Sequence, residues 1–336
     1  MAQKRFMDFL FKGFYITGRG VETRELSSGK IYLRIAVAIV LGMAILMLLL
    51  LVFKNRLVFY PAREIEITPA ATGWEFEDLF IASTGGARIN AWYLPGPAEK
   101  PPRTVLLLHG NGGNLENMLG RVMTYHKLDY GVLAIDYQGY GRSEGRPSEE
   151  NTYDDALAAW NFLVKEKGIP PENIVIHGFS LGGGVASYLA LEKKEYRNPL
   201  ILDSTFTKLR DVPAALNVLL SLPARFALGD AYDTESRLGE INSRIVLFFH
   251  SPEDDVVPYK LGRRIFEGYQ GGPKLFFELR GRHLDYPFNQ PVYADAFYSH
   301  VMNREPLLLR APKKDEDGSP AAPDGAAGTL DAPSIP

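Results

Sequence analysis

The stretch Asn173–Gly184, NIVIHGFSLGGG, carries the strongest structural signal in this chain of 336 residues. It opens on the β-branched run Ile174–Ile176, which is typical of a buried parallel strand. The chain then breaks at GFSLG, residues 178–182, and continues into residues 183–190, GGVASYLA, which fit a helix. The stretch therefore predicts a strand, a sharp turn with Ser180 at its apex, and a helix.

The pattern G-x-S-x-G between a strand and a helix is typical of a nucleophile elbow, where a serine takes a strained backbone conformation. Gly178 and Gly182 flank Ser180, and we expect a side chain at either position to collide with a neighbouring strand or helix. The following helix points its N-terminus at the serine, which favours negative charge there. The alternative is a plain glycine-rich strand-to-helix turn, so the rest of the chain must supply partners for the serine.

Composition limits the class of protein. A chain of this length holds one large α/β domain or two small ones, and 46% hydrophobic residues are enough for a sizeable core. The net charge of −3, without a dominant basic stripe, argues against nucleic acid as the main partner. Cysteine is absent, which excludes disulfides, thiolate metal sites and a cysteine nucleophile.

An uncharged run over residues 35–53 is expected to form an N-terminal transmembrane anchor. As a helix it spans about 28 Å, close to the hydrocarbon thickness of about 30 Å. No face of the run is polar, which disfavours a buried core helix. Residues 54–56, Lys-Asn-Arg, stand where a signal peptide would have a small-residue cleavage site, so we expect the anchor to be retained.

Basic residues are more frequent before this run than directly after it. The positive-inside rule then places residues 1–34 in the cytoplasm and the large domain on the opposite, periplasmic or extracytoplasmic side. Apolar residues over positions 6–14 recur at helical spacing. This spacing fits an interfacial helix on the inner leaflet, and an unstructured tail is the alternative.

Beyond the anchor the pattern alternates between strands and helices. Two strand-like runs, 74–82 and 88–94, are separated by a turn cluster and predict a hairpin. Apolar runs predict further strands at residues 105–108, 132–135, 174–176, 200–202, 245–249 and 275–279. Helices are expected between them, at residues 115–127, 151–167, 259–267 and 291–302. This order predicts a mostly parallel sheet with helices on both faces, within a domain over residues 55–308.

Two segments depart from this alternation. Residues 205–243 contain Pro213, Pro223 and apolar pieces, and an insertion here would cover the carboxyl ends of the strands, where ligands bind. We interpret it as a lid, and a surface helix pair is the alternative. Residues 311–336 are rich in Pro, Ala, Gly and Asp, and are expected to be disordered.

A serine nucleophile needs a base, an acid that orients the base, and donors for an oxyanion. His283 follows the last expected strand, where it can reach over the carboxyl edge of the sheet, and is the candidate base. The other histidines lie in helices, on the elbow strand or at strand ends, and fit structural or surface positions: His109, His126, His177, His250 and His300.

Three aspartates are candidates for the acid. Asp254 and Asp255 follow the expected strand 245–249, and Asp203 ends the strand before it. Each gives the chain order serine, aspartate, histidine, which is the order of hydrolases and differs from both protease orders of the same constellation. Order alone therefore leaves the acid open.

Backbone amides are expected to bind the oxyanion. We assign them to Leu181, which follows the nucleophile, and to Asn111 in the glycine-rich loop HGNGGN over residues 109–114. The segment GYGRSEG at residues 139–145 resembles a dinucleotide-binding loop, but its third glycine comes one residue late and no helix opens on it. No P-loop sequence and no histidine pair with zinc-ligand spacing occur, so no cofactor or metal is expected.

Five segments together resemble the α/β-hydrolase superfamily: LLLHGNGGN at 106–114, DYQGYGRSEGRPSE at 136–149, HGFSLGGGVA at 177–186, DDVVP at 254–258 and Arg282-His283. They are most similar to the membrane-anchored Bem46-type, ABHD13-like serine hydrolases, which also carry an N-terminal hydrophobic anchor. The resemblance covers roughly residues 55 to 305. It implies an α/β-hydrolase fold with a lid insertion, preceded by one transmembrane helix.

Carried over to this sequence, the family's nucleophile falls on Ser180, its base on His283 and its acid on Asp254 within HSPEDDVVP. Two positions depart from the family's pattern. Ser251 stands where glycine is usual, and Arg282 precedes the histidine where glycine is common. The arginine is expected to narrow the site or to add a positive charge near a substrate.

These observations predict a membrane-anchored serine hydrolase that cleaves a carboxylic ester or thioester through an acyl-enzyme. The expected substrate is a small-molecule or lipid-like ester, and nearness to the bilayer together with the apolar lid favours a lipid-like or acylated one. An aminopeptidase-like hydrolase is an alternative, for which Glu235 or Glu240 would receive a free amine. A catalytically silent binding module on the same fold is the other. The sequence makes no prediction about the oligomeric state.

Overall fold

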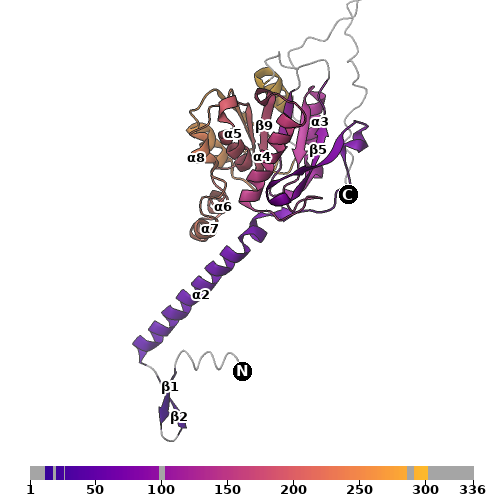
Figure 1. Cartoon of the computed structure of the whole chain (residues 1–336). Helices are drawn as coiled ribbons and strands as arrows, with labels where there is room; N and C mark the ends of the chain where they lie inside the picture. The colour runs from indigo at the N-terminus through magenta and orange to yellow at the C-terminus, as the bar shows by residue number, and fades with distance from the viewer. Residues whose placement is uncertain (1–11, 18–19, 26, 98–102, 286–290, 302–336) are drawn as a thin grey trace, which may run out of the picture.

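The computed structural model describes residues 12–17, 20–25, 27–97, 103–285 and 291–301. Its globular domain is built on an eight-stranded sheet with the strand order β12-β11-β10-β9-β6-β8-β5-β4. Figure 1 shows this sheet between layers of helices, with one long helix, α2, projecting from the domain.

The first two strands of this sheet form the predicted hairpin at one edge. β4 (Glu77–Ala82) pairs antiparallel with β5 (Arg88–Leu94), and β5 pairs antiparallel with β8 (Gly131–Ile135). All other neighbouring strands of the sheet are parallel: β6 (Thr104–Leu108), β9 (Ile174–Phe179), β10 (Leu200–Asp203), β11 (Val246–His250) and β12 (Lys274–Glu278). The prediction of a mostly parallel sheet is confirmed.

Helices cover both faces of the sheet, as the sequence predicts. One core contains residues of α4 (Glu149–Lys165), α5 (Leu181–Glu192) and α9 (Tyr259–Gly268). The other contains residues of α3 (Leu119–Lys127), α10 (Pro291–Ala296) and the π-helical turn Phe297–Val301. Successive side chains of a strand point to opposite faces, so Leu106 and Leu108 of β6 join the first core and Val105 and Leu107 the second.

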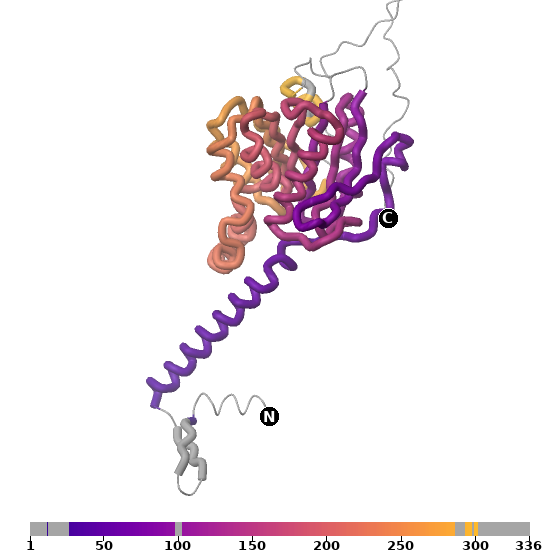
Figure 2. The backbone as a smooth tube through the Cα atoms, in the orientation of Figure 1, coloured from indigo at the N-terminus to yellow at the C-terminus, as the bar shows by residue number. Residues whose placement is uncertain are grey.

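The long helix α2 (Ser28–Val58) contains the whole uncharged run 35–53. It is long and apolar enough to cross a membrane, and none of its residues is buried in the protein. Figure 2 shows that it meets the globular domain only at its C-terminal end. The expected anchor therefore has the length, the composition and the exposure of a membrane-spanning helix.

No flexible linker separates α2 from the domain. β3 (Tyr60–Pro61) pairs in parallel with β7 (Gly112–Gly113) in the loop that follows β6. The amide of Tyr60 donates to the carbonyl of Asn111 at 2.8 Å, and Nδ2 of Asn111 donates to the carbonyl of Val58 at 2.9 Å. The last residue of α2 is thus hydrogen-bonded to the loop that holds a predicted oxyanion residue.

The N-terminal segment contains a hairpin that the sequence analysis does not predict. β1 (Lys12–Thr17) and β2 (Gly20–Glu25) pair antiparallel ahead of α2, so these two stretches are not an unstructured tail. Most of the residues at positions 6–14 on which the interfacial-helix interpretation rests lie outside the described residues. The β-branched and aromatic residues in these two stretches favour strands. Residues 1–11 and the tail at 311–336, for which disorder is predicted, lie outside the described residues.

The insertion over residues 205–243 is helical. It contains α6 (Asp211–Leu216), a 3₁₀ turn at Val218–Leu220, α7 (Ser221–Leu228) and α8 (Thr234–Leu238). In Figure 1, α6 and α7 lie beside the domain end of α2. The region is therefore a group of short helices that starts directly after β10.

The junction of β9 and α5 forms the predicted sharp turn. Ser180 has φ 53° and ψ −119°, a backbone conformation that residues other than glycine rarely adopt. A Cβ added to Gly178 would lie 2.1 Å from the carbonyl oxygen of Gly182, and one added to Gly182 would lie 2.2 Å from that of Leu108. The collisions expected at both glycines are confirmed.

Replacing Gly182 with alanine is expected to lower the free energy of unfolding by about 3 kcal/mol, because the new Cβ overlaps a buried strand carbonyl that cannot move away. Urea unfolding of the detergent-solubilised full chain measures the change. Gly268→Ala, at the end of α9 with nothing within 4 Å of the added Cβ, is the matched control and should not destabilise. Equal midpoints for the two variants would contradict the packing argument.

Candidate active site

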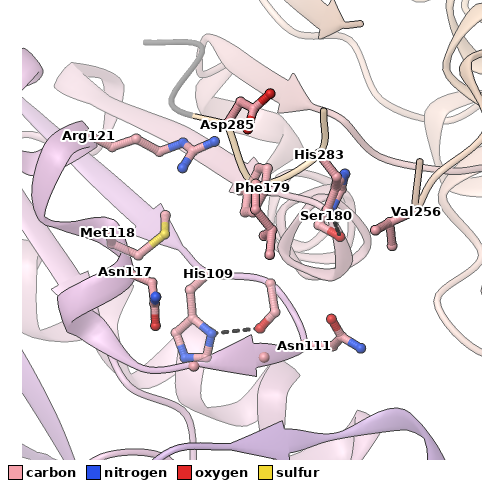
Figure 3. Close-up of a pocket in the computed structure, with 14 residues that line it drawn as sticks. His109, Asn111, Asn117, Met118, Arg121, Phe179, Ser180, Val256, His283 and Asp285 are labelled. Carbon is pink, nitrogen blue, oxygen red and sulfur yellow. Dashed lines mark hydrogen bonds between the residues drawn. The ribbon is translucent and has the colours of Figure 1, made fainter. Parts of the chain in front are cut away.

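Three of the predicted residues, Ser180, His283 and Asp254, meet at the carboxyl edge of the sheet. Oγ of Ser180 lies 3.0 Å from Nε2 of His283, and Nδ1 of His283 lies 2.7 Å from Oδ2 of Asp254. All three come from loops that follow parallel strands: β9, β11 and β12. Figure 3 shows Ser180 and His283 next to each other at the wall of a pocket. The three side chains form one continuous hydrogen-bonded chain.

The surroundings of Asp254 keep it ionised. Burial alone would raise the pKa of Asp254, but hydrogen bonds from His250 and His283 outweigh burial and hold this pKa well below its usual range. The amides of Val256 and Val257 also donate to Oδ1, at 2.9 and 2.7 Å. An ionised carboxylate at Nδ1 of His283 favours the proton on that nitrogen and leaves Nε2 free to accept a proton from the serine.

Asp203, the rival acid, is bound elsewhere. Its Oδ2 accepts hydrogen bonds from Nη2 and Nε of Arg121, at 2.9 and 3.2 Å, and His177 lies 3.7 Å away. Burial raises the pKa of Asp203, whereas the charge of Arg121 and the contact with His177 lower it to a net value of about 2. The carboxylate of Asp203 therefore neutralises a buried arginine, and the carboxylate bonded to His283 is that of Asp254.

Asp255 and Arg282 form an exposed pair beside the histidine. Nε of Arg282 donates to Oδ2 of Asp255 at 2.9 Å, and the amide of His283 donates to Oδ1 at 3.2 Å. The side chain of Arg282 is 72% exposed and does not line the pocket. The positive charge expected near a substrate is thus paired and directed to solvent. Ser251, the other departure, is buried, and its Oγ accepts from the amide of Glu253.

A cavity of about 390 Å³ lies over Ser180. Its walls come from the loop after β6, from α3 and the turn before it, and from the loops that carry Val256 and His283. The apolar residues of the lining are Met118, Phe179, Val256 and Leu284, and its charged residues are Arg121 and Asp285. Figure 3 shows Arg121 and Asp285 together on one side of this cavity.

The insertion over residues 205–243, which the structure describes in full, contributes no residue to the lining of this cavity. Its first residue, Thr205, contacts the turn between β9 and α5 through Oγ1, which donates to the carbonyl of Ser180 at 2.7 Å. The insertion thus contacts the turn that carries Ser180, and none of its residues lines the cavity. The lid interpretation stays a prediction.

The two predicted oxyanion donors lie on either side of the serine. A Cβ added to Gly110 would stand 3.3 Å from Cβ of Ser180, so the backbone at Gly110, the residue before Asn111, passes directly next to this serine. Leu181 is the first residue of α5, and the first amides of a helix have no intrahelical partner. Nδ2 of Asn111 donates to the carbonyl of Val58, which ties this side chain to the end of α2.

Sequence reasoning missed Arg121, Thr205 and Asp285. Arg121 lies in α3 on the same face as the buried residues Met118, Val122 and Tyr125, and its guanidinium also stacks over Phe179 at 3.9 Å. A charged residue on an apolar helix face was the available signal for this buried ion pair. Thr205 and Asp285 lie in loops that follow different strands. Their approach to Ser180 depends on tertiary packing, and no pattern in the nearby sequence predicts it.

His109 also lines the cavity but has a structural environment. Its Nδ1 lies 2.7 Å from the carbonyl of Gly110, and its ring packs on Tyr137 and Tyr140. Burial lowers the pKa of His109 to about 4, so the ring is neutral at pH 7. Among the described residues, no group of three or more acidic or histidine side chains is arranged to hold a metal ion.

Known proteins share both the sequence pattern and this architecture. A family model described as alpha/beta hydrolase fold matches residues 103–300. The chain belongs to the α/β-hydrolase superfamily. Over 227 residues it is 32% identical to the alpha/beta hydrolase domain-containing protein WAV2 of Arabidopsis thaliana, covering 62% of this chain and 73% of that protein. It is 30% identical to an uncharacterized membrane protein of Saccharomyces cerevisiae, covering 69% and 84%.

Solved α/β-hydrolase structures superpose on the domain. An α/β-hydrolase from Vibrio vulnificus covers 72% of this chain and 87% of its own, with a TM-score of 0.59 and 23% identity. An esterase from Pyrococcus furiosus covers 73% and 96%, with a TM-score of 0.58 and 20% identity. At these identities the likeness shows the fold, which agrees with the fold expected from the sequence.

The buried ion pair of Asp203 and Arg121 predicts that Asp203 contributes much more to stability than the exposed Asp255 does. Asp203→Asn is expected to lower the free energy of unfolding by about 3–5 kcal/mol, because it removes the carboxylate that accepts two hydrogen bonds from the buried guanidinium of Arg121. Asp255→Asn, which breaks an exposed pair with Arg282, is the matched control and should change stability little. Thermal unfolding of both variants measures the difference, and equal stabilities would refute the structural role given to Asp203.

Proposed function

We propose that this protein is a membrane-anchored serine hydrolase that cleaves carboxylic esters or thioesters. The observation that supports this most directly is the continuous chain from Asp254 through His283 to Ser180, with Ser180 held at a positive φ. A structural serine has no need of either the strained turn or an oriented histidine at 3.0 Å.

In the proposed mechanism, Oγ of Ser180 attacks the carbonyl carbon of the substrate while Nε2 of His283 accepts the hydroxyl proton. Asp254 stays ionised and stabilises the imidazolium that forms. The amides of Asn111 and Leu181 donate to the oxyanion of the tetrahedral intermediate. His283 then returns its proton to the leaving alcohol or thiol, which leaves an acyl-enzyme on Ser180.

Hydrolysis of the acyl-enzyme uses the same groups. His283 takes a proton from water, the hydroxide attacks the acyl carbon, and collapse of the second intermediate returns the proton to Oγ of Ser180. No cofactor enters either step. The roles assigned to the five residues thus account for a complete cycle that consumes one ester or thioester bond and one water molecule.

The lining of the cavity supports an acyl substrate. Met118, Phe179, Val256 and Leu284 supply apolar surface next to the serine, within a volume of about 390 Å³ that accepts a short or bent acyl chain. The Pyrococcus furiosus protein with the same fold is named an esterase. We therefore take a small-molecule or lipid-like ester as the substrate class.

The helix α2 supports the membrane part of the proposal, and the yeast relative is named a membrane protein. The excess of basic residues before the uncharged run 35–53 favours an N-terminus in the cytoplasm and a hydrolase domain on the opposite side of the membrane. On this proposal the protein is a single-pass membrane protein whose retained anchor ends at the domain.

An aminopeptidase-like activity is less well supported. It needs a carboxylate in the pocket to receive a free amine, and neither Glu235 nor Glu240 lines the pocket. The carboxylate that does line it, Asp285, already accepts a hydrogen bond from the amide of Arg282 at 2.6 Å. Glu235 is held by Arg264 through two hydrogen bonds, at 2.7 and 2.9 Å. The ester or thioester proposal needs no such carboxylate. The hydrogen-bonded chain from Asp254 through His283 to Ser180 argues against a catalytically silent binding module.

Labelling with a fluorophosphonate probe tests the nucleophile. The probe is expected to label the full chain in detergent and to fail on Ser180→Ala, and turnover of p-nitrophenyl acetate should fall about a million-fold. Ser236→Ala, a change at an exposed serine outside the cavity, is the matched control and should label normally. A folded full chain that the probe does not label would exclude the proposed hydrolase and favour the silent binding module.

The acid is tested by kinetics. Asp254→Asn is expected to lower kcat about ten-thousand-fold, because a neutral amide no longer favours the reactive tautomer of His283. Asp255→Asn keeps the carboxylate at Nδ1 and should retain most of the activity. Initial rates with p-nitrophenyl acetate, together with unfolding curves that show both variants folded, decide the assignment. A larger loss in Asp255→Asn than in Asp254→Asn would reverse it.

A further inference from the structure

One segment of the insertion carries an exposed apolar surface. Between residues 216 and 226, called here the apolar tip, six large apolar side chains are exposed: Leu216, Val218, Leu219, Leu220, Leu222 and Phe226. Leu219 is 79% exposed, and residues 212–224 contain no charge. Elsewhere in the described chain outside α2, exposed large apolar side chains occur singly or at the cavity. A contiguous patch of this kind marks an interaction surface.

The apolar tip lies beside the end of the proposed membrane anchor. Helices α2 and α7 are in contact, and Leu228 at the end of α7 lines one groove together with Lys54 and Val58 of α2. Figures 1 and 2 show α6 and α7 on the side of the domain from which α2 projects. Lys54 is the first charged residue after the uncharged run, so the tip lies where α2 leaves the apolar layer.

Ion pairs join the two segments of the insertion that flank the tip. Nζ of Lys208 lies 3.0 Å from Asp230 and 2.7 Å from Asp233, and Nη1 of Arg210 lies 2.7 Å from Asp230. Lys208 and Arg210 precede the tip in the sequence, and the two aspartates follow it. The insertion thus has charged residues on both sides of the apolar tip in sequence. This arrangement is typical of a segment that enters the boundary between lipid headgroups and acyl chains.

We propose that the apolar tip is a second membrane contact, inserted into the leaflet in which α2 ends. The proposal rests on the membrane anchoring proposed for α2. A lipid bilayer is the partner favoured over a protein because the tip adjoins α2, whose own exposed apolar side chains require hydrocarbon around them. Two contacts restrict rotation of the domain about α2 and hold the Asn111 loop, bonded to Val58, at the bilayer surface.

The absence of cysteine allows a direct test, since a single introduced cysteine takes a spin label without competition. Leu219→Cys places the label on the tip. Leu46→Cys places it in the middle of α2, and Phe80→Cys places it on the exposed edge strand β4 as the matched aqueous control. Each full-length variant is reconstituted in vesicles of phosphatidylcholine and phosphatidylglycerol. Collision rates with oxygen, which concentrates in hydrocarbon, and with a water-soluble nickel chelate are then compared.

The label at Leu219 is expected to collide severalfold more with oxygen than with the chelate, as at Leu46, while the label at Phe80 shows the reverse. A label at Leu219 that behaves like the one at Phe80, with Leu46 in hydrocarbon, overturns the tip proposal and leaves the anchor intact. Shielding of Leu219 from both reagents also overturns it, because a protein or a second copy then covers the tip. An aqueous Leu46 overturns the anchor and the tip together, whereas the fluorophosphonate result tests hydrolysis separately.

Discussion

The close approach of three backbone segments at the β9–α5 turn is the constraint on which the rest of the structure depends. Ser180 keeps its positive φ because its surroundings hold it from several sides: its amide donates to the carbonyl of Asp203 and its carbonyl accepts from Thr205. Gly178 and Gly182 let the strand, the helix and the end of β6 meet without side chains between them. Once the serine is fixed at the carboxyl edge, loops from strands on either side reach it.

The two buried aspartates at this edge show how similar positions acquire different chemistry. Both follow parallel strands and both have lowered pKa values, but the causes differ. Asp203 faces the fixed positive charge of Arg121, which no proton transfer can remove. Asp254 faces Nδ1 of His283, an imidazole whose other nitrogen, Nε2, lies 3.0 Å from the hydroxyl of Ser180. The identity of the partner, more than burial, therefore separates a structural carboxylate from one suited to catalysis.

Local patterns were enough to predict the sheet, most helices, the elbow and the approach of His283 to Ser180, because each depends on residues close in sequence or on the shared edge of parallel strands. The choice between Asp203 and Asp254 needed the family resemblance, since the deciding residue, Arg121, lies in a distant helix. The N-terminal hairpin was missed because neither of its strands alternates apolar and polar residues. The pairing of β3 with β7 was missed because two residues are too few to show a period. The path of the insertion beside the cavity depends on tertiary packing that composition does not encode.

Hydrogen bonds join the end of α2 directly to Asn111, so no flexible linker separates the proposed anchor from the proposed oxyanion loop. A spanning helix changes its tilt when the hydrocarbon layer is thicker or thinner than its apolar length. In this protein a tilt of α2 would move Val58, whose carbonyl accepts a hydrogen bond from the side chain of Asn111. The backbone amide of the same asparagine is the proposed oxyanion donor. On the proposed function, a change in bilayer thickness is therefore transmitted from the anchor to the loop proposed to hold the oxyanion, and the lipid composition of the membrane affects the geometry of that loop.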